Sequence, residues 1–239
     1  HGHHRRQRQM CIRDRRGSVP KGFMDLLDIG DLVYLYVEND QVKLDQIPQA
    51  QSSLISFNPK TGEVLSYVGG SVFNNSQFDR VRQSYPQSGS VFKPFIYASA
   101  FSRGYNPSSL INDAPIIFED ENLETFWRPE NYSGKFYGLT TLREALVQSI
   151  NIVSIKLLRE IGIKKSSETV DNFGFEIERL PQDLSLALGS GNFSPAEVAR
   201  GFSVFANDGM ISDIHYVDKI KDKNGDIIFD HSEIDAVNI

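Results

Sequence analysis

A serine and a lysine stand three positions apart at Ser90 and Lys93, where a helical pattern begins. At this spacing two side chains lie on one face of a helix, about one turn apart. A lysine amine that has lost its proton can then activate the serine hydroxyl, which is a poor nucleophile unaided. Phe92 and Phe95 follow at helical spacing, so the pattern predicts a helix over about 90–103 that could carry a nucleophile and its base.

The motif alone does not decide between this chemistry and an ordinary amphipathic helix, because about one match is expected by chance in a chain this long. A second match runs from Ser18 to Lys21, but the proline just before its lysine argues against a helix. Gly89 allows a sharp entry into the first helix, and Pro94 falls in its first turn, where a missing N–H costs little. These flanking residues favour Ser90.

A Ser-x-Asn triplet follows at Ser149 and Asn151, in a turn between helical patterns at 141–148 and 152–161. Such a turn can direct a hydroxyl and an amide into one cleft, although plain turn chemistry explains the same residue types. Another Ser-x-Asn at 190–192 lies in a Gly-rich loop with no helix on both sides. The first triplet is therefore the better partner for the Ser-x-x-Lys motif.

Five passages, in order along the chain, resemble the transpeptidase part of class A (bifunctional) penicillin-binding proteins. They are 56–70 (SFNPKTGEVLSYVGG), the surroundings of Ser90, 127–132 (WRPENY), 142–151 (LREALVQSIN) and 184–190 (LSLALGS). The resemblance covers residues from about 31 to about 209. It implies an α+β fold with helices packed on an antiparallel sheet, like that of serine β-lactamases and D,D-transpeptidases.

This resemblance implies that the chain is part of a peptidoglycan D,D-transpeptidase that is sensitive to penicillin. Ser90 would attack the D-alanyl-D-alanine carbonyl of a stem peptide, and an amine of a neighbouring stem would resolve the acyl-enzyme. Lys93 would accept the proton, Ser149 would relay one to the leaving amine, and Asn151 would hold the substrate backbone. No metal or organic cofactor is implied, and β-lactams should be covalent inhibitors.

The aromatic segment 127–137 has two interpretations. Its side chains could shape the rim of the substrate cleft, which makes Asn131 and Tyr132 secondary candidates for substrate binding. Aromatic residues flanked by Pro and Gly more often pin a long loop to the core, and we favour that interpretation.

The third motif of the family, Lys-Thr-Gly, occurs only at Lys60–Gly62, ahead of the nucleophile. Between strand patterns at Leu54–Phe57 and 63–67, this triplet fits a hairpin turn better than a catalytic strand. In the family the functional copy follows Ser-x-Asn, supplies a cation for the substrate carboxylate and completes the oxyanion hole. We therefore expect this strand beyond Ile239, and we expect residues 1–239 alone to be inactive or weakly active.

The domain organisation has three expected parts. Residues 1–16 (HGHHRRQRQMCIRDRR) lack a hydrophobic period and are expected to be a disordered or artefactual tail. Residues 17–48 would be the end of a small β-rich linker domain, with a hairpin, and residues 49–239 a partial transpeptidase domain. In the last part we expect helices at about 166–173 and 195–207, late strands at 214–220 and 227–229, and a solvated loop at Phe118–Asp120.

Charge and cysteine content limit the possible partners. The tail holds six Arg and one Asp, which leaves 19 basic and 30 acidic residues and a formal charge of −11. A body this acidic is not expected to bind nucleic acid. The single cysteine, Cys11, excludes an intrachain disulfide, and no apolar run reaches the ~18 residues that span a bilayer.

Three alternatives to a transpeptidase stay open at this stage: a serine β-lactamase, a β-lactam-sensing domain and a non-catalytic envelope scaffold. The chain lacks the Glu-x-x-Leu-Asn deacylation motif of β-lactamases. By resemblance we expect the periplasmic side of the bacterial inner membrane, an anchor near the amino terminus of the parent protein, and other envelope synthesis proteins as possible partners.

Overall fold

The computed structural model describes residues 27–45, 50–74, 76–120 and 125–231. The chain divides into two compact units, His1–Ala50 and Gln51–Ile239. The first unit contains the strands β1 (Tyr34–Glu38) and β2 (Gln41–Asp45), which pair antiparallel with Tyr34 opposite Asp45. The hairpin expected in this region is confirmed. The expected amino-terminal tail lies outside the described residues.

The second unit begins with a hairpin of β3 (Leu54–Phe57) and β4 (Val64–Val68). Lys60 lies in the turn between them, where the Gly62 amide donates to the Asn58 carbonyl at 2.8 Å. Gly62 has a φ of +80°, which a glycine adopts without steric cost. The Lys-Thr-Gly triplet is therefore part of a hairpin turn, as its Asn-Pro-Lys-Thr-Gly setting predicts.

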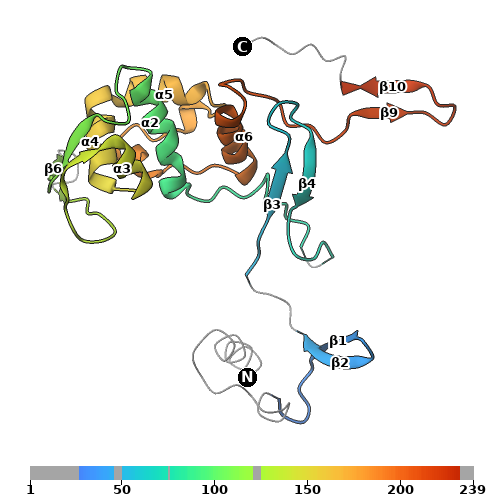
Figure 1. Ribbon diagram of the computed structural model, residues 1–239. Coiled ribbons are helices and arrows are strands. Elements are labelled where there is room, and N and C mark those ends of the chain that lie inside the picture. Colours follow the sequence, from blue (N-terminus) through green and yellow to red (C-terminus); the bar gives the residue numbers. More distant parts are fainter. Residues whose placement is uncertain (1–26, 46–49, 75, 121–124, 232–239) are drawn as a thin grey trace. The chain divides into compact units, whose positions relative to one another are not determined.

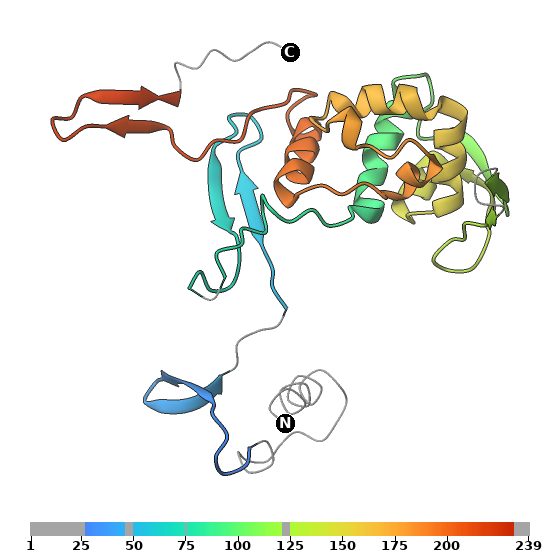
Figure 2. The same ribbon diagram turned by 180° about the vertical axis from the view of Figure 1, so that it is seen from behind.

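A group of helices makes up most of the second unit, and α2 lies among α3, α4 and α5 in both views (Figure 1, Figure 2). The helices are the 3₁₀ turn η2 (Gly89–Phe92), α2 (Lys93–Phe101), α3 (Leu142–Val147), α4 (Asn151–Ile161), α5 (Ile163–Asp171), the 3₁₀ turns η3 (Ile177–Arg179) and η4 (Leu184–Leu188), and α6 (Pro195–Ala206). All five helical patterns found in the sequence form helices. Among the described residues, no helix is both long and apolar enough to cross a membrane.

Three more antiparallel pairs complete the described strands. They are β5 (Leu110–Asp113) with β8 (Gly138–Thr141), β6 (Phe118–Asp120) with β7 (Thr125–Trp127), and β9 (Lys219–Lys221) with β10 (Ile227–Asp230). The α+β class is confirmed, and the strands form two-stranded sheets in the described part of the chain. The expected loop at Phe118–Asp120 is wrong, because these residues pair with β7.

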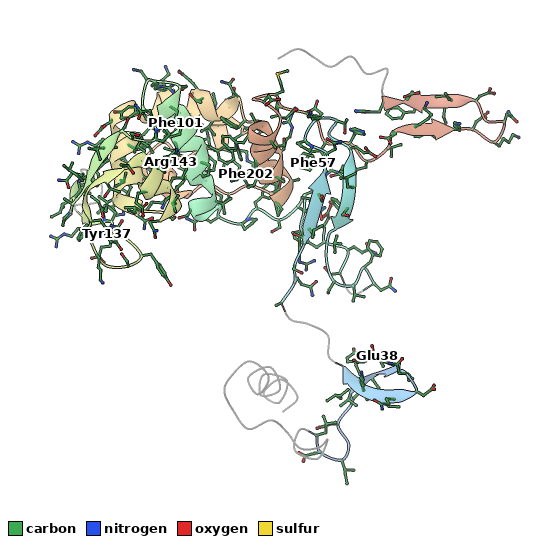
Figure 3. The ribbon with its side chains drawn as sticks, viewed as in Figure 1. Glu38, Phe57, Phe101, Tyr137, Arg143 and Phe202 are labelled. Carbon is green, nitrogen blue, oxygen red and sulfur yellow. The ribbon has the colours of Figure 1, made fainter. Side chains whose placement is uncertain are left out.

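The core of the second unit is rich in phenylalanine. Phe95 on α2 packs against neighbouring rings at centroid distances from 4.9 to 5.7 Å, and Phe92 meets Phe175 at 5.3 Å and Phe193 at 5.6 Å. Phe202 of α6 belongs to the same cluster (Figure 3). Helix α6 is held at its start by a capping box between Ser194 and Glu197. The cluster therefore joins α2, α6 and the 173–193 segment around one apolar centre.

We expect Phe95→Ala to lower the free energy of unfolding by about 3–5 kcal/mol, because it leaves a cavity in the core. Phe73→Ala is the matched control, since the ring of Phe73 is largely exposed. Its loss should change the free energy of unfolding by less than about 0.5 kcal/mol. Urea denaturation followed by circular dichroism measures both changes, and equal losses would contradict the placement of Phe95 in the core.

Candidate active site

Ser90 lies in the 3₁₀ turn that leads into α2. The backbone N–H of Lys93 donates to the carbonyl of Ser90, which keeps the two residues one turn apart. Phe92, between them, is fully buried in the aromatic cluster, whereas Ser90 is exposed. The aromatic core thus anchors this turn and presents the serine to solvent.

The loop 189–191 supports the residues just before Ser90. Gly89 N–H donates to the Gly189 carbonyl at 2.9 Å, and Ser88 N–H donates to the Gly191 carbonyl at 3.0 Å. Gly189 has a φ of +72°, and a Cβ there would collide with the backbone of Gly89. The second Ser-x-Asn triplet therefore belongs to the loop that supports the serine turn.

The Lys93 side chain is buried, with 1% of its surface exposed, and its amine points to the turn between α3 and α4. Lys93 Nζ donates to Ser149 O at 2.6 Å, to Ser149 Oγ at 3.0 Å and to Asn151 Oδ1 at 2.8 Å. An ammonium has three donors, so these acceptors satisfy the protonated form completely. The Ser-x-x-Lys and Ser-x-Asn motifs, 56 residues apart at Lys93 and Ser149, meet at this nitrogen.

Burial lowers the pKa of the Lys93 ammonium from its ordinary value to about 8, because the charged form loses hydration. A neutral amine has only two N–H donors and one lone pair. On deprotonation it must therefore give up one of its three acceptors, which leaves the lone pair able to accept a proton. Among the described residues, Ser90 Oγ makes no hydrogen bond to this amine.

The turn that receives Lys93 has an unusual backbone. Ser149 has a φ of +54°, in the left-handed region that non-glycine residues rarely adopt. Its N–H donates to Leu146 O at 3.1 Å, and the next N–H, of Ile150, donates to Ala145 O at 2.8 Å. These bonds hold the end of α3 against the start of α4, and they place both the carbonyl and the hydroxyl of Ser149 beside Lys93.

The two secondary candidates lie in different surroundings. Tyr132 is fully exposed, whereas Asn131 is buried. Asn131 Oδ1 accepts from the N–H groups of Asn151 and Ile152, and its Nδ2 donates to the Asp113 carboxylate and to Lys135 O. Both polar atoms of the Asn131 side chain are therefore hydrogen-bonded within the protein, and its assignment to substrate binding stays a prediction.

Asn151 keeps some capacity for a ligand. Its Oδ1 accepts from Lys93, and one N–H of Nδ2 donates to the Glu130 carbonyl at 2.9 Å. A second N–H of the same amide has no partner among the described residues. The described residues also hold no group of three or more His, Cys, Asp or Glu side chains that could bind a metal.

Sequence patterns did not identify Asp113 or the loop 189–191 as parts of this site. Asp113 ends the short strand β5, and its only local signal is a turn-forming Asn-Asp-Ala-Pro run. Its role depends on a contact with Asn131, 18 residues later. Only the folded chain shows that contact.

Comparison with known proteins gives a consistent family. A family model described as "Penicillin binding protein transpeptidase domain" matches residues 53–239. Penicillin-binding protein 1A of Pseudomonas aeruginosa is 41% identical over 214 residues, which cover 89% of this chain and 26% of that protein. The chain spans about a quarter of the length of the curated relatives it matches.

Solved structures of penicillin-binding proteins are also similar to this chain. Penicillin-binding protein 1A from Haemophilus influenzae aligns with a TM-score of 0.80 and 35% identity, over 86% of this chain and 31% of that one. PonA1 from Mycobacterium tuberculosis in complex with penicillin V aligns with a TM-score of 0.66 and 22% identity, over 77% of this chain and 52% of that one. At that identity the second likeness shows a shared fold.

The Lys93 amine should lose its proton with a midpoint near pH 8, so that it is mainly charged below this pH and mainly neutral above it. Carbon-13 NMR of lysine Cε, followed from pH 6 to 11, measures this midpoint. The spectrum of Lys93→Met assigns the resonance by its absence. A midpoint near the ordinary lysine value of about 10.4 would contradict the desolvation argument.

Proposed function

Because this chain belongs to the penicillin-binding protein transpeptidase domain family, we propose that it carries a D,D-transpeptidase site that cross-links peptidoglycan stem peptides through Ser90. One observation supports this most strongly. The buried amine of Lys93, one turn from Ser90, contacts both Ser149 and Asn151. Acyl transfer through a serine requires a base near that serine, and an amine that can lose its proton can serve as this base.

In the acylation step, Ser90 Oγ forms a bond to the carbonyl carbon of the penultimate D-alanine. Its proton passes to the neutral amine of Lys93, whose lowered pKa makes that transfer possible near pH 8. The peptide bond then breaks, and the terminal D-alanine leaves with a proton on its nitrogen. Ser149 Oγ, 3.0 Å from Lys93 Nζ, can relay that proton from the lysine to the leaving amine.

In the second step, an amine of a neighbouring stem peptide attacks the acyl carbon, and Ser90 Oγ leaves. The same groups work in reverse, since Lys93 returns a proton to Ser90 and Ser149 helps to deprotonate the attacking amine. Asn151 offers its uncommitted N–H to a carbonyl of the bound peptide. Tyr132, which follows Asn131 in the chain and is fully exposed, is a candidate contact for the bound peptide.

β-Lactams are the second ligand class in this proposal. Their strained amide presents a carbonyl carbon to Ser90 in place of the D-alanyl-D-alanine bond, and the ring opens without releasing a leaving group. The acyl-enzyme then persists, because no acceptor amine reacts with its acyl carbon.

The proposed location is the periplasmic side of the inner membrane, where stem peptides are cross-linked.

A fluorescent penicillin should label a protein that extends past Ile239 through the expected Lys-Thr-Gly motif. Ser90→Ala should abolish labelling, because we assign no other hydroxyl as the nucleophile. Lys93→Ala should slow acylation at least about 10²-fold, the usual scale of a lost general base. Gel fluorescence over a time course measures both effects.

Ser18→Ala and Lys60→Ala are the matched controls. Each removes a residue of a motif copy that we do not assign to the site, so both should leave labelling intact. Labelling that survives Ser90→Ala would refute the proposal.

The rate of deacylation separates the alternative functions. Rapid hydrolysis of the adduct would indicate a β-lactamase. A stable adduct fits the transpeptidase only if stem peptides are also cross-linked. A stable adduct without cross-linking would indicate a sensor, and no adduct would indicate a scaffold.

A further inference from the structure

We propose that Asn131, oriented by Asp113, is a positioning residue that caps α4 and thereby holds Ser149 and Asn151 in their active geometry. This inference rests on the proposed function of the site, because it concerns the same Ser-x-Asn turn. It gives Asn131 a role other than direct substrate binding.

Helix α4 begins without a cap of its own. The first N–H groups of a helix have no partner within it and need acceptors from elsewhere. The residue at the N-cap position is Ile150, whose side chain cannot accept a hydrogen bond. Asn131 Oδ1 accepts from Asn151 N–H at 3.0 Å and from Ile152 N–H at 3.1 Å. A residue 20 positions earlier in the chain therefore supplies the cap.

Asp113 decides which way the Asn131 amide faces. A carboxylate only accepts hydrogen bonds, so it holds Asn131 Nδ2, at 3.0 and 2.9 Å from its two oxygens, and turns Oδ1 toward α4. Asp113 is itself buried and held by the backbone N–H of Tyr137 at 2.9 Å, in the loop before β8 (Figure 3). The β5–β8 pair thus holds the Asp113 carboxylate in place, and this carboxylate in turn orients the Asn131 side chain that caps α4.

The cap lies next to a backbone conformation that needs support from its surroundings. Ser149, two residues before the first capped N–H, has the φ of +54° that a serine adopts only under constraint from its surroundings. Without the Asn131 cap, the start of α4 loses two hydrogen bonds and can fray. The Ser149 backbone can then relax toward negative φ, which moves both oxygens that contact Lys93.

The Asn151 side chain extends the same network to the catalytic amine. Glu130, the residue before Asn131, accepts from Asn151 Nδ2 through its carbonyl, and this leaves Asn151 Oδ1 facing Lys93. Glu130 and Asn131 therefore hold both the backbone and the side chain of Asn151. This segment transmits the position of β5 to Lys93 through ordinary hydrogen bonds.

The test compares Asn131→Ala with Ser194→Ala in the extended protein described above. Both variants delete a helix cap made by a buried residue, but Ser194 caps α6, and the site does not include it. Stopped-flow acylation by a fluorescent penicillin separates the first-order acylation constant from the dissociation constant of the initial complex. We expect Asn131→Ala to lower the acylation constant at least about tenfold with little change in the dissociation constant, since misplacing catalytic groups by about 1 Å costs up to 10²-fold.

Ser194→Ala should keep the acylation constant within about twofold of the wild type, because its effect stops at the stability of α6. If Asn131→Ala lowers acylation no more than Ser194→Ala does, the proposal fails while the labelled wild type still supports the proposed function. A change confined to the dissociation constant would also overturn it, because that would show direct contact with the ligand.

A second variant and a second measurement keep the test independent of labelling. Combining Asp113→Asn with Asn131→Asp exchanges the two side chains, so that an amide at position 113 can donate to a carboxylate at position 131, which can still cap α4. This double variant should recover part of the acylation lost in Asn131→Ala, although the carbonyl of Lys135 loses its donor. In the single variant Asn131→Ala without ligand, backbone hydrogen exchange at residues 149–152 should be faster than in the wild type. Unchanged exchange there would overturn the proposal even if the wild type is never labelled.

Discussion

The burial of one amine is the constraint on which the site depends. Lys93 Nζ is enclosed beside α4, where only hydrogen bonds replace its hydration, and its three acceptors are two oxygens of Ser149 and one of Asn151. A buried ammonium without such partners would be strongly disfavoured. The α3–α4 turn must therefore approach α2 closely, and the exposed Ser90 stands one helical turn before this lysine, whose pKa is lowered by burial.

Two parts of the structure hold this arrangement. The phenylalanine cluster anchors the serine turn through Phe92, and the loop 189–191 fixes its entry through backbone hydrogen bonds. Strand β5 and the segment at Asn131 hold the start of α4. Each part positions one motif, so the distance between the motifs is set by the packing of α2 against α4.

The sequence predicted the parts of the site that local patterns encode. Ser90 and Lys93 share one helical face, and Ser149 and Asn151 share one turn, so short spacings were enough to select them. The hairpin formed by Leu54–Phe57 and Val64–Val68 and the capping box at Ser194 follow equally local rules. The structure then brings the two motifs together, which their separation in the chain could not show without a family resemblance.

What the sequence did not predict depends on distant pairing. Strands β5 and β8 are four residues each and pair across 24 intervening residues, so neither has a strong period of its own. Asn131 sits in an aromatic, proline-containing segment that resembles a loop at a cleft rim. Its burial and its role as a cap follow from the position of Asp113, and only the paired strands determine that position.

The central claim is that the Lys93 amine makes Ser90 the nucleophile of an acyl-enzyme. Mass spectrometry of a tryptic digest of the extended protein, after reaction with benzylpenicillin, tests it most directly, because it locates the adduct on one residue. We expect the intact mass of the antibiotic on the peptide that contains Ser90, with fragment ions that place it on that serine. An adduct on Ser149 or on any other residue would contradict the account.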